Sequence, residues 1–222
     1  CAVALKMRET LKPDRVIPLG MGIIARNYAS LLRHKSFMFY TLAGGFGSAG
    51  MFAYISGSSR VFIDVYQVDP RYFGLFFGAN AASLIIASQF SSKLLNKHAP
   101  EKLMRRAQWL VLAATSAGVL LTLAGHLTLT LLMLCLMSFM VGQGFVNPNA
   151  AALALSEQGK RLGVASALMG TVQMLCGALS GLAVSAWQSH TALPLTGILF
   201  VCGALSWLFG RLADESSSRA CA

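Results

Sequence analysis

Long apolar stretches separated by short polar segments alternate along the chain from about residue 37 onward. Each stretch is long enough for the roughly 20 residues that an α-helix needs to cross the hydrocarbon core of a bilayer. The pattern therefore predicts an all-α membrane protein with a bundle of six transmembrane helices within residues 37–212. The predicted spans are 37–58, 73–95, 107–125, 128–154, 162–187 and 191–210.

Positive charge falls in every second gap between these stretches. Sixteen of the 18 Lys and Arg residues lie before the first stretch, between the second and third, between the fourth and fifth, or after the sixth. The other two, Arg60 and Arg71, lie on the opposite side. Because Lys and Arg accumulate in cytoplasmic loops, this alternation predicts six crossings with both ends of the segment in the cytoplasm.

The composition agrees with a membrane protein. Hydrophobic residues make up 55% of the chain and charged residues 12%, with a mean hydropathy of +0.62. A soluble domain carries about 25% charged residues. The formal charge of +10 is explained by the loops between the predicted spans, so the lipid bilayer is the expected partner and nucleic acid is not.

The predicted spans carry little reactive chemistry. All eight carboxylates lie in loops or at span ends, and no Asp, Glu, Lys or Arg lies at mid-membrane depth. A proton-coupled transporter normally has a titratable residue at that depth, so this chain alone is not expected to complete proton coupling. The cysteines lack metal or disulfide spacing, and His126 and His190 lack catalytic partners. We therefore expect no cofactor, no metal and no enzymatic activity.

Small and polar residues inside the spans are the candidate functional positions, because hydrocarbon offers them no partners. They fall on one face of each of three helices, and each face has two readings: it lines a polar cavity or it packs tightly against another helix. In the fifth span these residues are Ser166, Gly170, Gln173, Gly177 and Ser180. In the second they are Asn80, Ser83, Ala87 and Ser91, and in the first Tyr40, Gly44, Gly47, Met51 and Tyr54, next to Ser48.

Polar residues and a proline interrupt the fourth span. Pro148 has no N–H and clashes with the carbonyl four residues back, which predicts a kink near Gly144. The freed backbone groups either line a cavity or are satisfied by neighbouring amides. The polar residues at this break are Gln143, Asn147 and Asn149.

The segment before the first span and the tail after the last form separate regions. The apolar residues 1–5, ahead of Lys6, look like the cytoplasmic end of a preceding membrane helix. Residues 1–36 are predicted to comprise this end and a cytoplasmic linker with a short amphipathic helix, whose apolar residues are Ile23, Ile24, Tyr28, Leu31 and Leu32. Residues 213–222 are the predicted cytoplasmic tail.

Several short motifs, in order and spacing, resemble a known transporter family. They are Glu9–Pro13, Arg33–Lys35, Gly50–Ser56, Phe73–Gly74 with Phe77 and Asn80, Asn147–Ala150 and Ala165–Leu168. Over nearly its whole length the chain resembles the C-terminal half of bicyclomycin-resistance-type (Bcr/CflA) drug/proton antiporters, within the major facilitator superfamily. It departs from that family at Ser59–Arg60, where a proline often follows the serines.

The resemblance implies half of a twelve-helix transporter, built from two three-helix repeats, in a bacterial inner membrane. The implied partners are an N-terminal six-helix half, a small drug or related amphiphile, and protons. The seventh, eighth, tenth and eleventh helices of that fold line the cavity most, so the predicted substrate contacts are Ser48, Met51, Tyr54, Asn80, Gln143, Asn147 and Gln173. The alternative is a self-contained six-helix protein that acts as a homodimeric channel or transporter.

Overall fold

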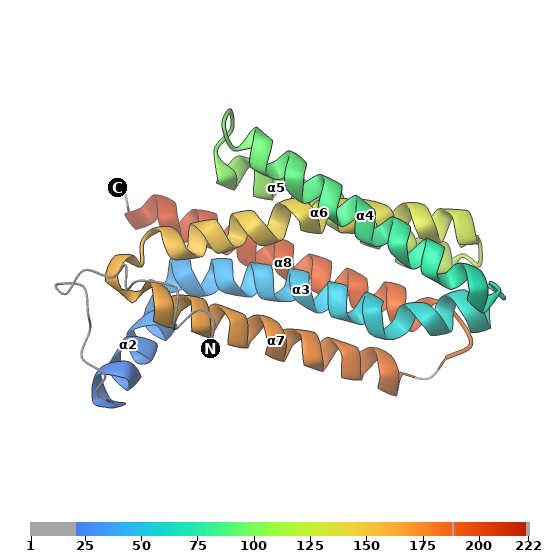
Figure 1. Cartoon of the computed structure of the whole chain (residues 1–222), viewed down its shortest axis with the longest axis horizontal. Coiled ribbons are helices and arrows are strands. Elements are labelled where there is room, and N and C mark those ends of the chain that lie inside the picture. Colours follow the sequence, from blue (N-terminus) through green and yellow to red (C-terminus); the bar gives the residue numbers. More distant parts are fainter. Residues whose placement is uncertain (1–20, 188, 221–222) are drawn as a thin grey trace, which may run out of the picture.

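The computed structural model describes residues 21–187 and 189–220, and within them the chain is helical (Figure 1). The predicted end of a preceding helix and the motif Glu9–Pro13 lie outside the described residues. The elements are α2 (Met21–Arg33), α3 (Lys35–Arg60), η2 (Val61–Val65), α4 (Pro70–Leu94), α5 (Pro100–Leu123), α6 (Leu129–Ser156), η3 (Gly159–Arg161), α7 (Leu162–Ala186) and α8 (Leu193–Ala220).

Each of the six predicted spans coincides with one long helix, α3 to α8. Five of them, α4 to α8, are both long enough and apolar enough to cross a membrane. The sixth, α3, has 26 residues, but its glycines and hydroxyl side chains lower its hydropathy. A helix surrounded by other helices has less need of an apolar surface, and α3 is in that position.

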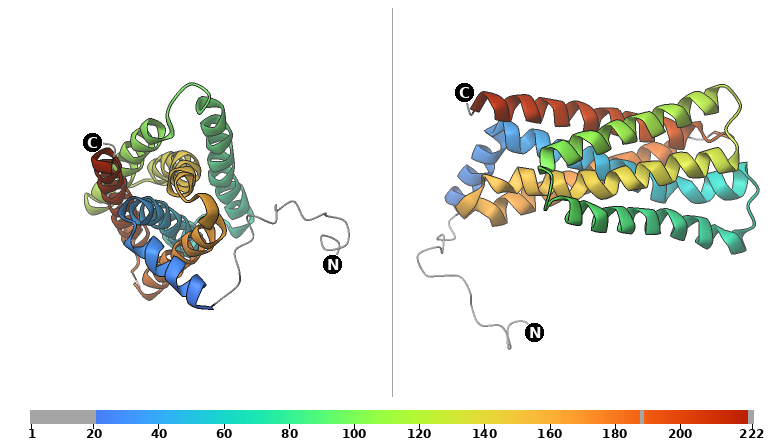
Figure 2. Two further views of the ribbon diagram at one scale, coloured as in Figure 1. Left: turned by 90° about the vertical axis from the view of Figure 1, so that its left-hand side faces the viewer. Right: turned by 90° about the horizontal axis from the view of Figure 1, so that it is seen from above.

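The helices pack in two interlocked groups of three. Helix α3 packs along α7 and α8, while α6 packs along α4 and α5. The remaining large contacts join α3 to α6 and α5 to α8. Exchanging α3, α4 and α5 with α6, α7 and α8 maps this contact pattern onto itself, as expected for two related three-helix repeats. Helices α5 and α8 therefore lie on one side of the central pair α3 and α6, and α4 and α7 lie on the opposite side (Figure 2).

Glycines allow the central helices to approach their neighbours closely. A Cβ atom on Gly144 of α6 would lie 2.7 Å from the carbonyl oxygen of Leu84 and 2.9 Å from the backbone nitrogen of Ser88, both in α4. A Cβ atom on Gly177 of α7 would lie 2.5 Å from the ring of Phe52 in α3. In a membrane, where lipid is as apolar as leucine, such close backbone packing stabilises helix pairs.

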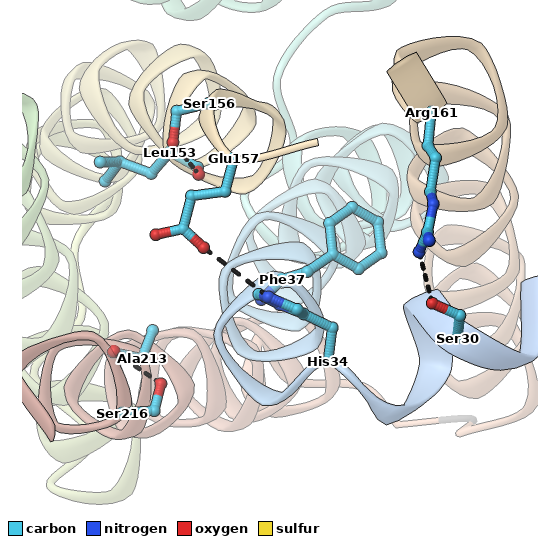
Figure 3. Close-up of polar contacts among 9 residues, drawn as sticks. All are labelled: Ser30, His34, Phe37, Leu153, Ser156, Glu157, Arg161, Ala213 and Ser216. Atoms are coloured by element: carbon cyan, nitrogen blue, oxygen red, sulfur yellow. Dashed lines mark hydrogen bonds and ion pairs between the residues drawn. The ribbon is translucent and has the colours of Figure 1, made fainter. Parts of the chain in front are cut away.

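One end of the bundle is held by polar contacts between α2, α3 and the loop between α6 and α7 (Figure 3). The Nδ1 atom of His34 accepts a hydrogen bond from the backbone of Phe37 and caps α3, while its Nε2 atom lies 3.7 Å from Glu157. Arg161 donates to the hydroxyl of Ser30 in α2. Leu31 of α2 is fully buried, so α2 is attached to the bundle on its apolar side. Whether α2 lies on a membrane surface stays a prediction.

The opposite end carries a short π-helix, η2, directly after α3. Phe62 in η2 is fully buried and stacks on Phe76 of α4 with ring centroids 5.7 Å apart. The hydroxyl of Tyr66 donates to the carbonyl of Leu127 at 2.7 Å, and burial raises the pKa of Tyr66 above its ordinary value. These contacts fix the loop between α3 and α4 against the loop between α5 and α6.

Candidate functional site

Three amide side chains from α6 and α7 converge on two glycines of α3. A Cβ atom on Gly47 would lie 2.5 Å from Oε1 of Gln143 and 3.1 Å from Oδ1 of Asn147. A Cβ atom on Gly44, one turn earlier, would lie 3.5 Å from Nε2 of Gln173. We call Gln143, Asn147 and Gln173 the amide cluster. Its three members are among the seven substrate contacts predicted from the sequence. They pack against α3 at Gly44 and Gly47, where the absence of side chains leaves room for them.

The amide cluster has unused hydrogen-bonding capacity. Gln143 is fully buried, and neither Nε2 nor Oε1 has a hydrogen-bond partner. Oδ1 of Asn147 is also buried without a partner. Gln173 is half-buried and makes no hydrogen bond to any described residue. Because more than about 90% of buried polar groups in proteins are paired, this concentration of unpaired amides in one place is unusual.

Two further predicted residues lie together nearer the η2 end of the bundle. The ring of Tyr54 in α3 stacks on Phe77 of α4 at 5.3 Å, and its hydroxyl is buried without a hydrogen bond. The amide nitrogen of Asn80 donates to the carbonyl of Phe76 and approaches the sulfur of Met133 in α6 at 3.5 Å. Tyr54 is seven residues beyond Gly47, about 10 Å along the helix, so this pair is separate from the amide cluster.

The remaining predicted residues, Ser48 and Met51, make no hydrogen bond with the amide cluster within the described part of the chain. Ser48 is buried beside Gly47 but points about 100° further around α3. Met51 is half-buried and packs against the apolar cluster that includes Tyr54. Their role as substrate contacts stays a prediction, as it does for Tyr54 and Asn80.

The polar face predicted on α7 divides into two parts. Ser180 donates to the carbonyl of Ala49 in α3 at 2.6 Å, and Gly177 packs on Phe52, so this part is a helix–helix contact. Ser166 is exposed, and a Cβ atom on Gly170 would meet nothing within 4 Å. Gln173 lies at the boundary between the packed and the open part.

The polar stripe on α4 packs against α6. The amide of Asn149 donates both to the hydroxyl of Ser91 at 2.9 Å and to the carbonyl of Phe145 at 2.6 Å. The α6 backbone continues as a single helix through Pro148, with Asn149 binding one of the nearby carbonyls. Asn149 therefore serves the contact between α4 and α6.

Sequence reasoning did not single out two buried hydroxyls or one long polar side chain. The hydroxyls of Thr41 and Ser58 are buried in α3 without partners. Gln108 of α5 is buried and donates to the carbonyl of Ser206 in α8 at 2.7 Å. A hydroxyl in a helix normally binds the carbonyl three or four residues back. A serine or threonine in a span therefore does not by itself indicate a functional position. Gln108 could have been found from the sequence, because it is an amide near the start of a predicted span.

Charged side chains of the described helices lie toward the helix ends and away from the amide cluster. Tyr40 donates to Asp214 at 3.3 Å, and His34 and Glu157 lie near that same end of the bundle. The amide cluster can therefore recognise a ligand by hydrogen bonds and apolar contacts, without a charge of its own.

A helical bundle of two interlocked repeats, with unpaired amides between its central helices and span-length apolar helices around them, defines a membrane transport domain. Residues 3–181 match the family model of the Major Facilitator Superfamily. The chain belongs to this superfamily and is a multi-pass membrane protein of its fold.

Two curated relatives are similar to the chain over nearly all of its length. It is 33% identical over 206 residues to an uncharacterized MFS-type transporter, YdgK, of Bacillus subtilis (strain 168). This match covers 93% of this chain and 51% of the relative. It is 33% identical over 202 residues to a bicyclomycin resistance protein homolog of Haemophilus influenzae, with 90% and 50% covered. The chain thus spans about half the length of the curated relatives it matches.

Proposed function

We propose that this chain forms the C-terminal half of a multidrug efflux transporter, which exchanges small drugs or related amphiphiles for protons by alternating access in a bacterial inner membrane. Drug export is favoured by the similarity to a protein named for bicyclomycin resistance. The half-transporter assignment is favoured by the length of the relatives, which are about twice as long as the match.

The observation that carries the proposal is the amide cluster. Gln143, Asn147 and Gln173 meet at Gly44 and Gly47, where α3, α6 and α7 come together. Gln173 and Asn147 are both half-buried, so a substrate reaches them before the fully buried Gln143. Gln143 becomes accessible when α3 and α6 move relative to each other, which is the kind of motion that alternating access requires.

The partner half supplies what the amide cluster lacks. The predicted spans have no charged residue at mid-depth, so we infer that the carboxylate that binds and releases the coupling proton belongs to the N-terminal half. That half also covers part of the apolar surface on α4 and α7, where Leu75, Ile85, Leu179 and Leu182 are each at least 58% exposed. Substrate then binds between the two halves.

Replacement of Gln173 by alanine in the complete transporter tests this proposal. We expect changed susceptibility to some drugs with membrane abundance near wild type, because Gln173 makes no hydrogen bond to any described residue and its loss therefore removes none. The measurement is minimum inhibitory concentration for a drug panel, together with abundance by immunoblot and a thermal melt of purified protein.

Ser180→Ala is the matched control on the same face of α7. It removes the hydrogen bond to Ala49 and should lower thermal stability by up to about 1–2 kcal/mol while affecting every substrate alike. If Gln173→Ala behaves like Ser180→Ala, with lower stability and uniform transport per molecule, Gln173 belongs to the scaffold and the proposed site is wrong.

A second prediction concerns orientation. The loops after α3, α5 and α7 lie at one end of the bundle, and the loops after α4 and α6 lie at the other (Figure 1). Because positive charge is concentrated at the second end, we expect a cysteine introduced at His126 to react with a membrane-impermeant maleimide in intact cells, and one at Lys97 to react only after permeabilisation. Labelling of Lys97→Cys in intact cells would reverse the proposed orientation.

A further inference from the structure

Two adjoining cavities open at the η2 end of the bundle, away from the amide cluster. One has a volume of about 230 Å³ and lies between the ends of α3 and α7 and the start of α8. The other, of about 310 Å³, is lined by η2 and by the loop between α7 and α8. Arg60 and Ser189 line both cavities, so the two adjoin, and we call them together the recess.

The recess presents one positive and one negative group that are not paired with each other. Arg60 and Asp64 both line the larger cavity, four residues apart, at the junction of α3 and η2. In the described part of the chain no ion pair within 4.0 Å involves either side chain. His190 and the hydroxyl of Ser189 line the same cavity. Both charges are therefore free to bind a ligand that carries both signs.

The smaller cavity adds an apolar slot beside these charges. Its wall includes Val184, Leu195 and Trp187, and the Trp187 ring comes within about 3.6 Å of where a Cβ atom on Gly197 would lie. Trp187 follows the last residue of α7 and is 47% exposed. Tryptophan at the end of a span is typical of the membrane–water interface. The recess therefore lies at the level of lipid headgroups.

These features select a ligand class. Arginine binds phosphate through two parallel hydrogen bonds, and a carboxylate binds a protonated amine. A volume of 310 Å³ is at the lower limit of the roughly 300–1,000 Å³ that drug-sized ligands occupy, so a compact group fits best. A purely anionic headgroup would leave Asp64 facing a second negative charge, whereas a phosphate joined to a primary amine satisfies both side chains.

We propose that this recess binds the phosphoethanolamine headgroup of a membrane phospholipid. The phosphate binds Arg60 and the Ser189 hydroxyl, the ammonium group binds Asp64, and the glycerol and first part of the acyl chain follow the apolar slot beside Trp187. The site is independent of the amide cluster and does not require drug transport.

Native mass spectrometry of the purified protein, released from mixed phosphatidylethanolamine and phosphatidylglycerol, tests the proposal. Wild-type protein should retain phosphatidylethanolamine in preference to phosphatidylglycerol. Arg60→Gln and Asp64→Asn should each weaken that retention about tenfold, the loss expected for one charge-assisted contact. Arg71→Gln is the matched control, because it removes a positive charge at the same end without lining either cavity. Thermal melts establish that each variant is folded.

Three outcomes would overturn the proposal. The first is equal retention of both lipids by the wild type, and the second is wild-type retention of phosphatidylethanolamine by both cavity variants. In the third, soluble glycerophosphoethanolamine binds as well as the lipid and displaces it. The recess would then recognise the same chemical group on a soluble molecule, and the assignment to a membrane lipid would be wrong.

Discussion

Replacement of Gly144 by alanine is expected to be among the most destabilising single-methyl changes in this bundle. The new Cβ atom would lie 2.7 Å from the Leu84 carbonyl oxygen and from Cβ of Ala87, and 2.9 Å from the Ser88 backbone nitrogen. Two of these are backbone atoms of α4, which cannot rotate away as a flexible side chain does. The helices α4 and α6 must separate instead, at a cost of about 1–3 kcal/mol or more.

The measurement is the melting temperature of the purified variant, together with its abundance in the membrane. Gly78→Ala is the matched control in α4, because a Cβ atom there meets nothing within 4 Å. It should be neutral or slightly stabilising, since alanine favours helix more than glycine does. Equal melting temperatures for the two variants would show that α4 and α6 do not approach as closely as described.

The positions of the helices could be predicted from hydropathy because of what a membrane requires. Backbone groups in hydrocarbon must pair within their own helix, so a sufficiently long apolar stretch has essentially one structure available. The helix ends were less predictable. Helix α5 begins at Pro100, before the predicted start at residue 107, and α8 continues to Ala220, into the predicted tail. Hydropathy reports only the part of a helix inside lipid, while helical hydrogen bonding continues into water.

The packing partners of each polar face could not be predicted from one sequence. Gln173 and Ser180 share a face of α7, yet Ser180 donates a hydrogen bond to the α3 backbone and Gln173 makes no hydrogen bond to any described residue. Helical periodicity places residues on a face but carries no information about the distance to the next helix. That distance is set by small residues on the partner, here Gly44 and Gly47 of α3, whose significance appears only when the helices are packed together.

The low hydropathy of α3 also results from the small residues that allow close helix packing. Five glycines and several serines would make a poor lipid-facing helix, but α3 contacts α6, α7 and α8 and is largely enclosed by them. Small residues there allow three neighbours to approach closely. A helix that looks marginal by hydropathy is thus a central element of the bundle.

The second large effect is expected when residues 1–222 are expressed alone. They should insert into the membrane yet give a drug-sensitive strain no resistance. The chain spans about half the length of its curated relatives, and its predicted spans have no charged residue at mid-depth to carry a proton. Susceptibility to a panel of drugs, compared with an empty-vector strain, measures the effect, and immunoblotting of membranes establishes that the segment is present.

Co-expression distinguishes a half-transporter from a self-contained protein. If the apolar surfaces of α4 and α7 are covered by a six-helix N-terminal half, supplying that half as a second polypeptide should restore efflux. A half with its membrane carboxylate replaced by an amide should restore assembly, seen by co-purification, without proton-driven export. Proton-dependent export by residues 1–222 alone would instead establish the homodimeric six-helix alternative. A dimer would then have to complete the coupling site with a residue outside the predicted spans, because neither copy has a titratable carboxylate at mid-depth.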